Sequence, residues 1–243
     1  MRIAIVADIH GNLTALEAVV RDLRVTSPDL IVHGGDLATH GHRPAEVIDL
    51  IRALGWPGVV GNTDEMMWRP DRQAALETGA PQMASLFRIL FGSLAPATRD
   101  LIGEDRLAYL QSLSMQWTND GLALVHATPD SLWRSIQPDV PDSELQQVYG
   151  PLGSRIAVYC HIHKPYVRQV DDLWVCNTGS VGMSFDGDRR ASYLLIDEGT
   201  PATRRVEYDV DSEIARLLTS GYPQAEWLAA ILKTAGFVPP PTG

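Results

Sequence analysis

The stretch RIAIVADIHGNL, residues 2–13, determines how the rest of the chain is interpreted. Residues 3–7 are aliphatic without alternating polar positions, which is typical of a strand buried on both faces. Asp8 and His10 follow at once, and from Leu13 apolar residues recur at helical spacing until Ser27-Pro28. The stretch therefore predicts a buried strand, a polar loop at its carboxyl end and an amphipathic helix.

The same rhythm continues along the chain. Residues 30–32 predict a second short buried strand closed by Gly34-Gly35, and a second helix follows Pro44. Residues 57–60 predict a third strand, which stops at Gly61. Strands that alternate with helices predict a parallel sheet with crossover helices. Such sheets bind ligands at the carboxyl ends of their strands.

The chain changes character after the third strand. Residues 64–113 are mostly helical in composition and predict a helical insertion near the site. Tight turns are expected at residues 119–121 and 171–172, and residues 211–243 predict a helical tail. Further strands are expected at residues 115–118, 122–126, 156–160, 167–170, 173–176, 191–196 and 204–208. We expect residues 1–243 to form a single domain.

Composition excludes several classes of function. A formal net charge of −10 argues against stable binding to nucleic acid, which needs a basic face. No apolar run approaches the roughly 20 residues that cross a bilayer, and the first strand leads straight into polar residues rather than a signal-peptide cleavage site. Two cysteines, Cys160 and Cys176, are too few for a disulfide scaffold. We expect a cytoplasmic protein without a membrane partner, and its oligomeric state stays open.

Five polar clusters follow predicted strands. A lone Asp or Asn in such a place is usually a helix cap or turn former, and a lone His usually makes a structural hydrogen bond. Here, however, four of the seven histidines lie in these clusters, which makes chance placement a poor explanation. The clusters are Asp8-Ile9-His10, Gly35-Asp36, Gly61-Asn62, His126-Ala127 and His161-Ile162-His163.

The side chains of these clusters suit a transition metal. Carboxylate oxygen and imidazole nitrogen are ligands for manganese, iron or zinc, whereas calcium would need more oxygen ligands. Gly35 and Gly61 would let the backbone approach the ions closely.

The clusters resemble the signature of the calcineurin-like metallophosphoesterase superfamily, and in particular its small bacterial and archaeal phosphodiesterases. That signature reads DxH, GDxxxxG, GN[HC]D, HG or HA, and GHxH. Its five motifs occur here in order, and residues 8–13 and 177–182 are also similar to the small phosphodiesterases. The likeness covers residues 1 to about 210. The matching segments are residues 8–10, 35–41, 61–64, 126–127 and 160–163.

The resemblance implies a fold, a cofactor and a reaction. The fold would be a two-sheet α/β sandwich flanked by helices. Two divalent metal ions would be bound, manganese or iron first and zinc or nickel as alternatives. A water or hydroxide bridging the ions would attack phosphorus in line, and no residue would become phosphorylated. One ion would be held by Asp8, His10 and His163, the other by Asn62, His126 and His161, with Asp36 bridging both.

Two positions depart from the family pattern. Cys160 replaces a glycine, and Thr63 replaces a histidine that many members use near the leaving group. The small phosphodiesterases often lack this histidine too. A threonine cannot protonate an alkoxide at neutral pH, so the general acid is unassigned. His40, and less so His42, could supply that proton. We take His40 and Asn62 as the candidate catalytic residues.

Other polar residues have structural interpretations. Asp64 is expected to orient the Asn62 loop, and His33 to be packed in its strand. Asn12 could contact a substrate phosphate at the start of the first helix or simply begin that helix.

The resemblance favours hydrolysis of a small phosphodiester. A phosphomonoesterase or a dinucleoside-polyphosphate hydrolase is the alternative. A protein-interaction scaffold is a weaker one, because scaffolds of this superfamily have lost metal ligands and all seven are present here.

Overall fold

The first sheet is built around the strand that opens the sequence. The computed structural model describes residues 1–241. Strand β1 (Arg2–Val6) pairs in parallel with β2 (Leu30–His33) on one side. On its other side it pairs antiparallel with β8 (Ala191–Asp197), which in turn pairs antiparallel with β9 (Thr200–Val206).

The second sheet has five strands in the order β3-β4-β5-β7-β6. Its central strands β4, β5 and β7 are parallel, and the edge strands β3 and β6 are antiparallel to their neighbours. The two turns predicted at residues 119–121 and 171–172 join β3 to β4 and β6 to β7. The strands span Gln116–Asn119 (β3), Leu122–Val125 (β4), Ile156–Tyr159 (β5), Tyr166–Val170 (β6) and Leu173–Asn177 (β7).

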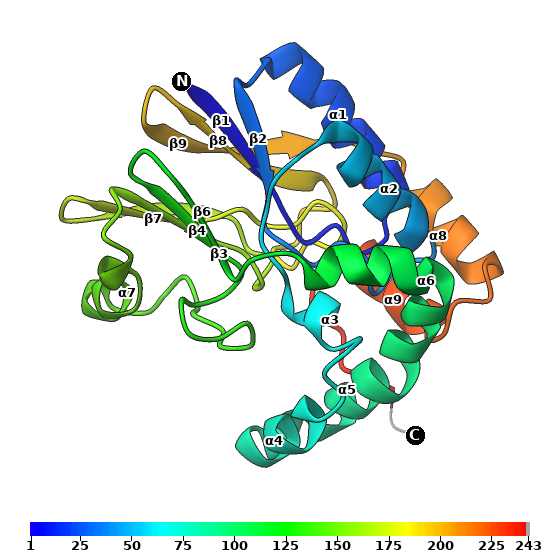
Figure 1. The fold of residues 1–243 in the computed structure, drawn as a ribbon. Helices are drawn as coiled ribbons and strands as arrows, with labels where there is room; N and C mark the ends of the chain where they lie inside the picture. Colours follow the sequence, from blue (N-terminus) through cyan, green and yellow to red (C-terminus); the bar gives the residue numbers. More distant parts are fainter. Residues whose placement is uncertain (242–243) are drawn as a thin grey trace.

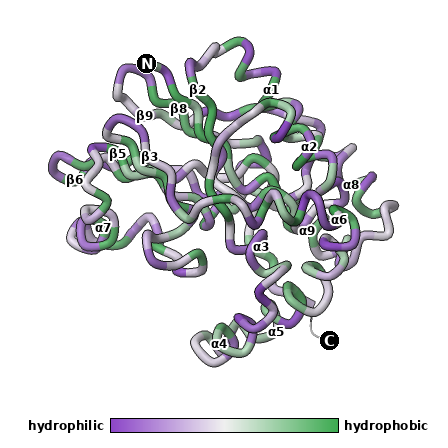
Figure 2. Tube along the Cα trace, in the orientation of Figure 1, coloured by the Kyte–Doolittle hydropathy of each residue, from purple (hydrophilic) through white to green (hydrophobic). Residues whose placement is uncertain are grey.

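The two sheets pack face to face and helices cover both outer faces (Figure 1). Ile3 and Ile5 point into the core between the sheets, while Ala4 and Val6 point toward the helices. This arrangement explains the uninterrupted aliphatic run of β1, because both of its faces are buried. In Figure 2 the strands at the centre of the molecule are accordingly mostly hydrophobic. The predicted two-sheet α/β sandwich is confirmed.

Four helices pack on the outer face of the first sheet and one on the second. Asn12 caps the first of them, because its side chain accepts a hydrogen bond from the Ala15 amide at 3.0 Å. These helices are α1 (Leu13–Thr26), α2 (Pro44–Leu54), α8 (Val210–Thr219) and α9 (Ala225–Thr234), with α7 (Asp142–Tyr149) on the second sheet.

The segment at residues 62–111, which precedes β3 in the sequence, is helical, and its first part extends below the two sheets in Figure 1. A break at Gly103, with φ of 69°, interrupts its last helix. Its elements are α3 (Asn62–Glu65), α4 (Arg72–Gly79), a 3-10 turn (Pro81–Met83), α5 (Ala84–Ile89), a π-helical turn (Leu90–Leu94) and α6 (Ala95–Gln111).

Three elements differ from the sequence-based prediction. Residues 57–60 make only two isolated parallel bridges, Gly58 to His33 and Val59 to Ser114, because the next residues turn directly into α3. Strand β9 lies four residues earlier than predicted at its start, since the Glu198-Gly199 turn begins it immediately after β8. Helix α7 was not predicted, and its short apolar face is built on Leu145 and Val148.

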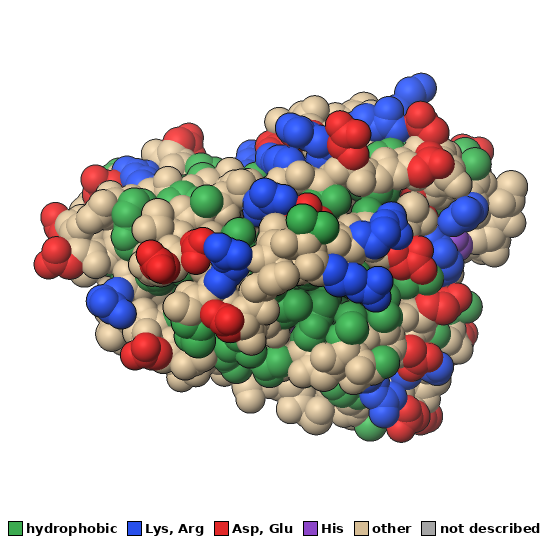
Figure 3. Space-filling model, turned by 90° about the horizontal axis from the view of Figure 1, so that it is seen from above, with side chains coloured by type: hydrophobic (Ala, Val, Ile, Leu, Met, Phe, Trp, Pro, Cys, Tyr) green, Lys and Arg blue, Asp and Glu red, His purple; other side chains and the backbone are tan. Residues whose placement is uncertain are grey.

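The surface carries charges of both signs. On the face shown in Figure 3, Lys and Arg side chains alternate with Asp and Glu rather than forming one basic area. None of the helices in residues 1–241 combines the length and apolar character that crossing a bilayer requires.

His33 is a fully buried titratable residue at the end of β2. Its Nδ1 has no hydrogen-bond partner, and its Nε2 lies 3.4 Å from the Tyr109 hydroxyl. Burial lowers the pKa of His33 to about 4. The imidazole is therefore neutral in the folded protein at pH values where an unfolded chain would already protonate it.

We predict that His33 makes the fold less stable in acid. Between pH 6.5 and 4 the unfolded state binds the extra proton, so the free energy of unfolding falls as pH falls, by about 2 kcal/mol at pH 5. Urea unfolding in EDTA at pH 7 and pH 5 measures this loss. The His33→Gln variant should lose about 2 kcal/mol less than the wild type between the two pH values. Equal losses in the two proteins would show the prediction to be wrong.

Candidate metal centre

The seven residues predicted as metal ligands converge where the carboxyl ends of the strands meet. In the first sheet Asp8 and His10 follow β1, and Asp36 follows β2. In the second sheet His126 follows β4, and the two remaining histidines follow β5. Asn62 opens helix α3. The residues are Asp8, His10, Asp36, Asn62, His126, His161 and His163, and all of them are buried except His161, which is half-buried.

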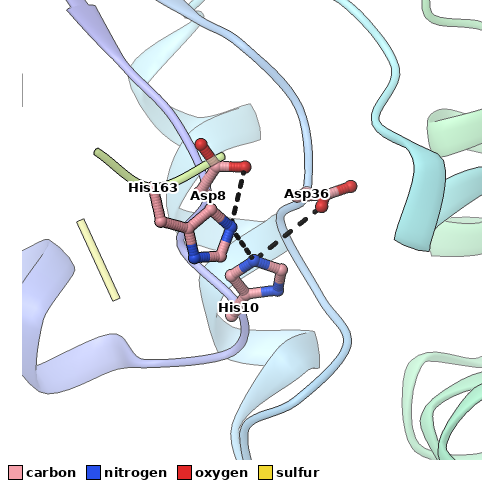
Figure 4. Close-up of side chains that lie close together, drawn as sticks. All are labelled: Asp8, His10, Asp36 and His163. Carbon is pink, nitrogen blue, oxygen red and sulfur yellow. Dashed lines mark hydrogen bonds and ion pairs between the residues drawn. The ribbon is translucent and has the colours of Figure 1, made fainter. Parts of the chain in front are cut away.

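One group contains Asp8, His10, Asp36 and His163 (Figure 4). One potential ligand atom from each lies within 4.8 Å of the others. His10 Nε2 is 3.1 Å from His163 Nε2, and His163 Nε2 is 3.4 Å from Asp8 Oδ1. His10 Nε2 is 3.8 Å from Asp36 Oδ2.

A second group is centred on the Asn62 side chain. Asn62 Oδ1 lies 2.8 Å from His126 Nε2 and 2.8 Å from His161 Nδ1. His126 Nε2 is also 3.5 Å from Asp36 Oδ2. Asp36 therefore approaches both groups through the same carboxylate oxygen.

Hydrogen bonds to backbone carbonyls fix the orientation of three of the four histidines. A carbonyl oxygen can only accept, so Nδ1 of each of these rings carries the proton and Nε2 of the neutral ring presents a lone pair. The carbonyls of Thr39, Gly34 and Met183 lie 2.8, 2.8 and 2.6 Å from Nδ1 of His10, His126 and His163, respectively. His161 is reversed: its Nε2 contacts the Ser135 hydroxyl at 3.0 Å and its Nδ1 faces the cluster.

This arrangement fits bound cations. When both rings are neutral, the Nε2 lone pairs of His10 and His163 face each other at 3.1 Å. Asp8 Oδ1 is buried without a hydrogen-bond partner. Converging acceptors of this kind repel one another unless a positive charge lies between them. Nitrogen and carboxylate oxygen together suit manganese, iron, zinc or nickel.

Burial and charge tune these groups. Burial lowers the pKa of His10 well below its usual range, and the neighbouring His40 and His163 rings lower it further. Burial, with His126 and His163, likewise lowers the pKa of His161. Burial lowers the pKa of His126, but the Asp36 and Asp8 carboxylates outweigh it and the pKa is raised overall. The two carboxylates therefore favour positive charge at this point.

Five of the seven residues have a left-handed backbone conformation. The φ angles are 54° for Asp8, 54° for His10, 52° for Asp36, 67° for His161 and 56° for His163. Such conformations cost about 1–3 kcal/mol each in non-glycine residues and gather at functional sites. Each turns a side chain sharply at the end of a strand, which brings the ligand atoms together.

Gly35 and Gly61 allow the two central loops to touch each other. The expected reason for these glycines was close approach of the backbone to the ions. A Cβ atom at Gly61 would lie 2.0 Å from Asp36 Oδ1, and one at Gly35 would lie 2.4 Å from the Gly61 nitrogen. Asp64 then joins these loops, because its carboxylate accepts hydrogen bonds from the amides of Asp36, Leu37 and Gly61. Burial and Asp36 raise the pKa of Asp64 to about 7. Asp64 orients the loop, as the sequence suggested.

The loop at residues 177–183 supports the site in a way that sequence reasoning missed. The Ser180 hydroxyl donates to the Asp8 carbonyl and accepts from the Met183 amide, each at 2.7 Å. The Met183 carbonyl in turn orients His163. The similarity of this loop to the small phosphodiesterases was the available signal, but a sequence does not show which backbone groups a loop will present.

Of the other candidate residues, His40 and Thr63 line a cavity beside the metal centre, whereas His42 and Asn12 make contacts elsewhere. His40 lines the cavity beside the ligands, and its ring centroid is 4.8 Å from that of His10. Thr63 lines the same cavity, with a buried hydroxyl that has no partner. His42 points away toward Glu213 at 3.3 Å. Asn12 uses its side chain to cap α1 and to donate to the Gly182 carbonyl, which places its amide in the structure of the fold.

Two packed sheets with outer helices, and Asp, Asn and His side chains gathered at the strand ends, define the metallophosphoesterase class of fold. A solved metallophosphoesterase from Sphaerobacter thermophilus has the same fold, with a TM-score of 0.78 and 25% identity over 97% of this chain and all of that one. The hypothetical protein PH1004 from Pyrococcus horikoshii OT3 gives a TM-score of 0.80 at 20% identity, covering 98% and 99% of the two chains.

The chain belongs to the calcineurin-like phosphoesterase superfamily, whose domain matches residues 1–200. The uncharacterized protein MJ0912 of Methanocaldococcus jannaschii is 30% identical over 251 residues, covering 93% of this chain and 95% of that protein. The resemblance seen in the motifs is thereby confirmed.

We predict that Asp64→Asn weakens metal binding without contacting the ions. An amide has one accepting oxygen instead of two, so at least one backbone amide among Asp36, Leu37 and Gly61 loses its partner. Loss of such supporting bonds costs about 10–100-fold in metal affinity. Calorimetric titration with Mn²⁺ measures this, and Asp49→Asn, which alters an exposed pair with Arg106, is the control. Equal affinities in the two variants would contradict the role of Asp64.

Proposed function

We propose that the protein is a metal-dependent phosphodiesterase for a small phosphate ester. The single observation that supports it best is the convergence of seven nitrogen and oxygen ligands into two groups that share Asp36 Oδ2. A scaffold protein would have no need for unpartnered buried acceptors that repel one another. Metal binding by this centre would also explain why the ligand loops keep a strained backbone conformation.

The proposed ligand set assigns Asp8, His10 and His163 to one ion and Asn62, His126 and His161 to the other. Asp36 is the proposed bridge. When bound, two divalent ions would lower the pKa of a water nucleophile and neutralise charge on the phosphoryl oxygens. Manganese or iron is the proposed metal, with zinc or nickel as alternatives.

The chain's own groups would orient the substrate beside this centre. His40 and Thr63 line the cavity next to the ligands. His40 Nδ1 and Thr63 Oγ1 are both buried without partners, so each is free to hydrogen-bond a substrate oxygen. Since neither Thr63 nor a neutral imidazole is a general acid at neutral pH, His40 is the proposed hydrogen-bond donor to the leaving oxygen and does not transfer a proton to it. Burial and His163 lower the pKa of His40 to about 4, so the ring acts from its neutral form near pH 7.

We predict that hydrolysis of bis-p-nitrophenyl phosphate requires metal and Asp36. EDTA should abolish turnover, and Mn²⁺, Fe²⁺, Zn²⁺ or Ni²⁺ added back should restore it to different extents. Asp36→Asn should lower kcat by at least about 10³-fold, because it removes a charge that both ion sites share. Metal analysis of protein purified without chelator accompanies the assay. Full activity in Asp36→Asn would refute the shared-ligand assignment, and metal-free, inactive protein would favour a scaffold. Asp197→Asn, far from the site in an exposed pair with Arg2, is the control.

We also predict that His40 matters more for poor leaving groups than for good ones. A hydrogen bond to the charge that develops on the leaving oxygen is worth about 10²–10³-fold, whereas p-nitrophenolate leaves readily without such a bond. His40→Ala should therefore lower kcat/KM by about 10²-fold for dibenzyl phosphate and by less than about tenfold for bis-p-nitrophenyl phosphate. His42→Ala, which changes a neighbouring histidine held by Glu213, is the matched control. Equal losses for both substrates in His40→Ala would exclude a role at the leaving group.

A further inference from the structure

The metal centre forms one side of a cavity that His40 and Thr63 also line, and the remaining lining residues are apolar. His10, Asp36, Asn62, His161 and His163 lie on the metal side. The opposite walls come from three separate segments of the chain. They are formed by Leu86 and Leu90 of the helical insertion, Met183 and Phe185 of the loop after β7, and Trp227, Ile231 and Phe237 of the C-terminal region.

These walls are fixed by packing and hydrogen bonds rather than by loose loops. The Phe185 ring stacks on the His163 imidazole with centroids 4.5 Å apart, and it meets Phe237 edge to face at 6.5 Å. Trp227 is buried, and its indole N–H donates to the Val238 carbonyl at 2.9 Å. This bond ties the segment that carries Phe237 back onto α9. Packing and hydrogen bonds therefore hold the apolar wall in place as far as His163, a residue of the metal centre.

The charge of this cavity limits what can bind in it. Among the described residues that line it, Asp36 is the only one with a full charge and neither Lys nor Arg is present. Polyphosphates are bound by Arg and Lys side chains that pair with each phosphate. In this cavity, positive charge for a phosphoryl group would come only from ions bound at the metal side. That side accommodates a single phosphoryl group. A chain of several phosphates would place negative charge against Leu, Phe and Trp.

The size of the cavity suits one small apolar group. Its volume is about 120 Å³, and a cavity of about 150 Å³ lined by aliphatic and aromatic side chains is known to bind benzene. The cavity is open at its rim, where 54% of Phe237 is exposed. Because the volume of about 120 Å³ includes the metal side, a phosphoryl group there leaves room for only one small apolar ring or short chain, which would extend toward the open rim.

We propose that this cavity selects phosphodiesters in which one ester group is a small apolar ring or chain, and that the helical insertion and the C-terminal segment determine that choice. The proposal rests on the proposed phosphodiesterase function and names its substrate class. The apolar group would lie between the insertion and the C-terminal wall, with the phosphoryl group held at the metal centre.

Two stable phosphonate monoesters test the proposal. The monomethyl esters of phenylphosphonate and methylphosphonate are monoanions like a phosphodiester and differ in one apolar group. Competition against bis-p-nitrophenyl phosphate hydrolysis by the Mn²⁺-loaded full-length protein gives their inhibition constants. Burying the ring should make the phenyl compound bind at least about tenfold more tightly.

Variants at the rim show whether the cavity causes this difference. Phe237→Ser and Leu86→Gln change partly exposed wall residues outside the metal ligands and should each reduce the phenyl preference by at least about threefold. Leu101→Ser is the matched control, because Leu101 is also half-exposed, at 50%, but lies on α6 outside the cavity. Circular dichroism and melting temperature verify that all three proteins are folded.

The outcomes separate the two proposals. Metal-dependent turnover with a phenyl preference that falls in both rim variants and persists in Leu101→Ser supports the substrate class. Turnover with no phenyl preference, or with a preference that the rim variants leave unchanged, overturns the substrate class and leaves the phosphodiesterase function standing. A folded, metal-loaded protein without turnover overturns the function and the substrate class together.

Discussion

The rest of the site depends on the contacts that the Asp36 carboxylate makes with both groups of side chains. One of its oxygens faces His10 of the first group and His126 of the second. Its other oxygen accepts the Thr63 amide at 2.9 Å. Because burial raises the pKa of this group, its charged form needs compensating positive charge or donors. The loops of both sheets surround this carboxylate, so the contacts that it makes depend on the position of one sheet relative to the other.

The site also shows how a fold retains an unfavourable local conformation. Left-handed backbone at Asp8, His10 and Asp36 would be lost if nothing opposed relaxation. The β1 and β2 loops hold each other through backbone hydrogen bonds, among them the Asp8 amide to the Gly35 carbonyl at 3.1 Å. Asp64 and the loop at residues 177–183 add further bonds. Since Asp and His adopt this conformation more readily than most residues, the ligand types themselves lower its cost.

Sequence reasoning predicted which side chains gather at the strand ends but not their geometry. The aliphatic run of β1 and the polar residues that follow it predict a buried strand with a site at its end, because strand burial and side-chain chemistry are local properties. The orientation of His161, reversed relative to the other histidines, depends on Ser135, which is 26 residues away and carries no motif. Residues 57–60 were predicted as a strand because apolar content does not show whether the chain turns into α3. The apolar wall escaped prediction for the same reason, since its three segments meet only in the folded chain.

Part of the proposed apolar wall lies in a different region of the chain from the candidate ligands. The seven candidate ligands lie between residues 8 and 163, inside the region that matches the superfamily domain. Trp227, Ile231 and Phe237 lie beyond that region. A change in the C-terminal wall therefore alters the space beside the metal centre from outside the domain that carries the ligands, and Phe237 approaches His163 through the ring of Phe185. Because the Phe185 ring stacks on His163, it couples the shape of the cavity to the position of a candidate ligand.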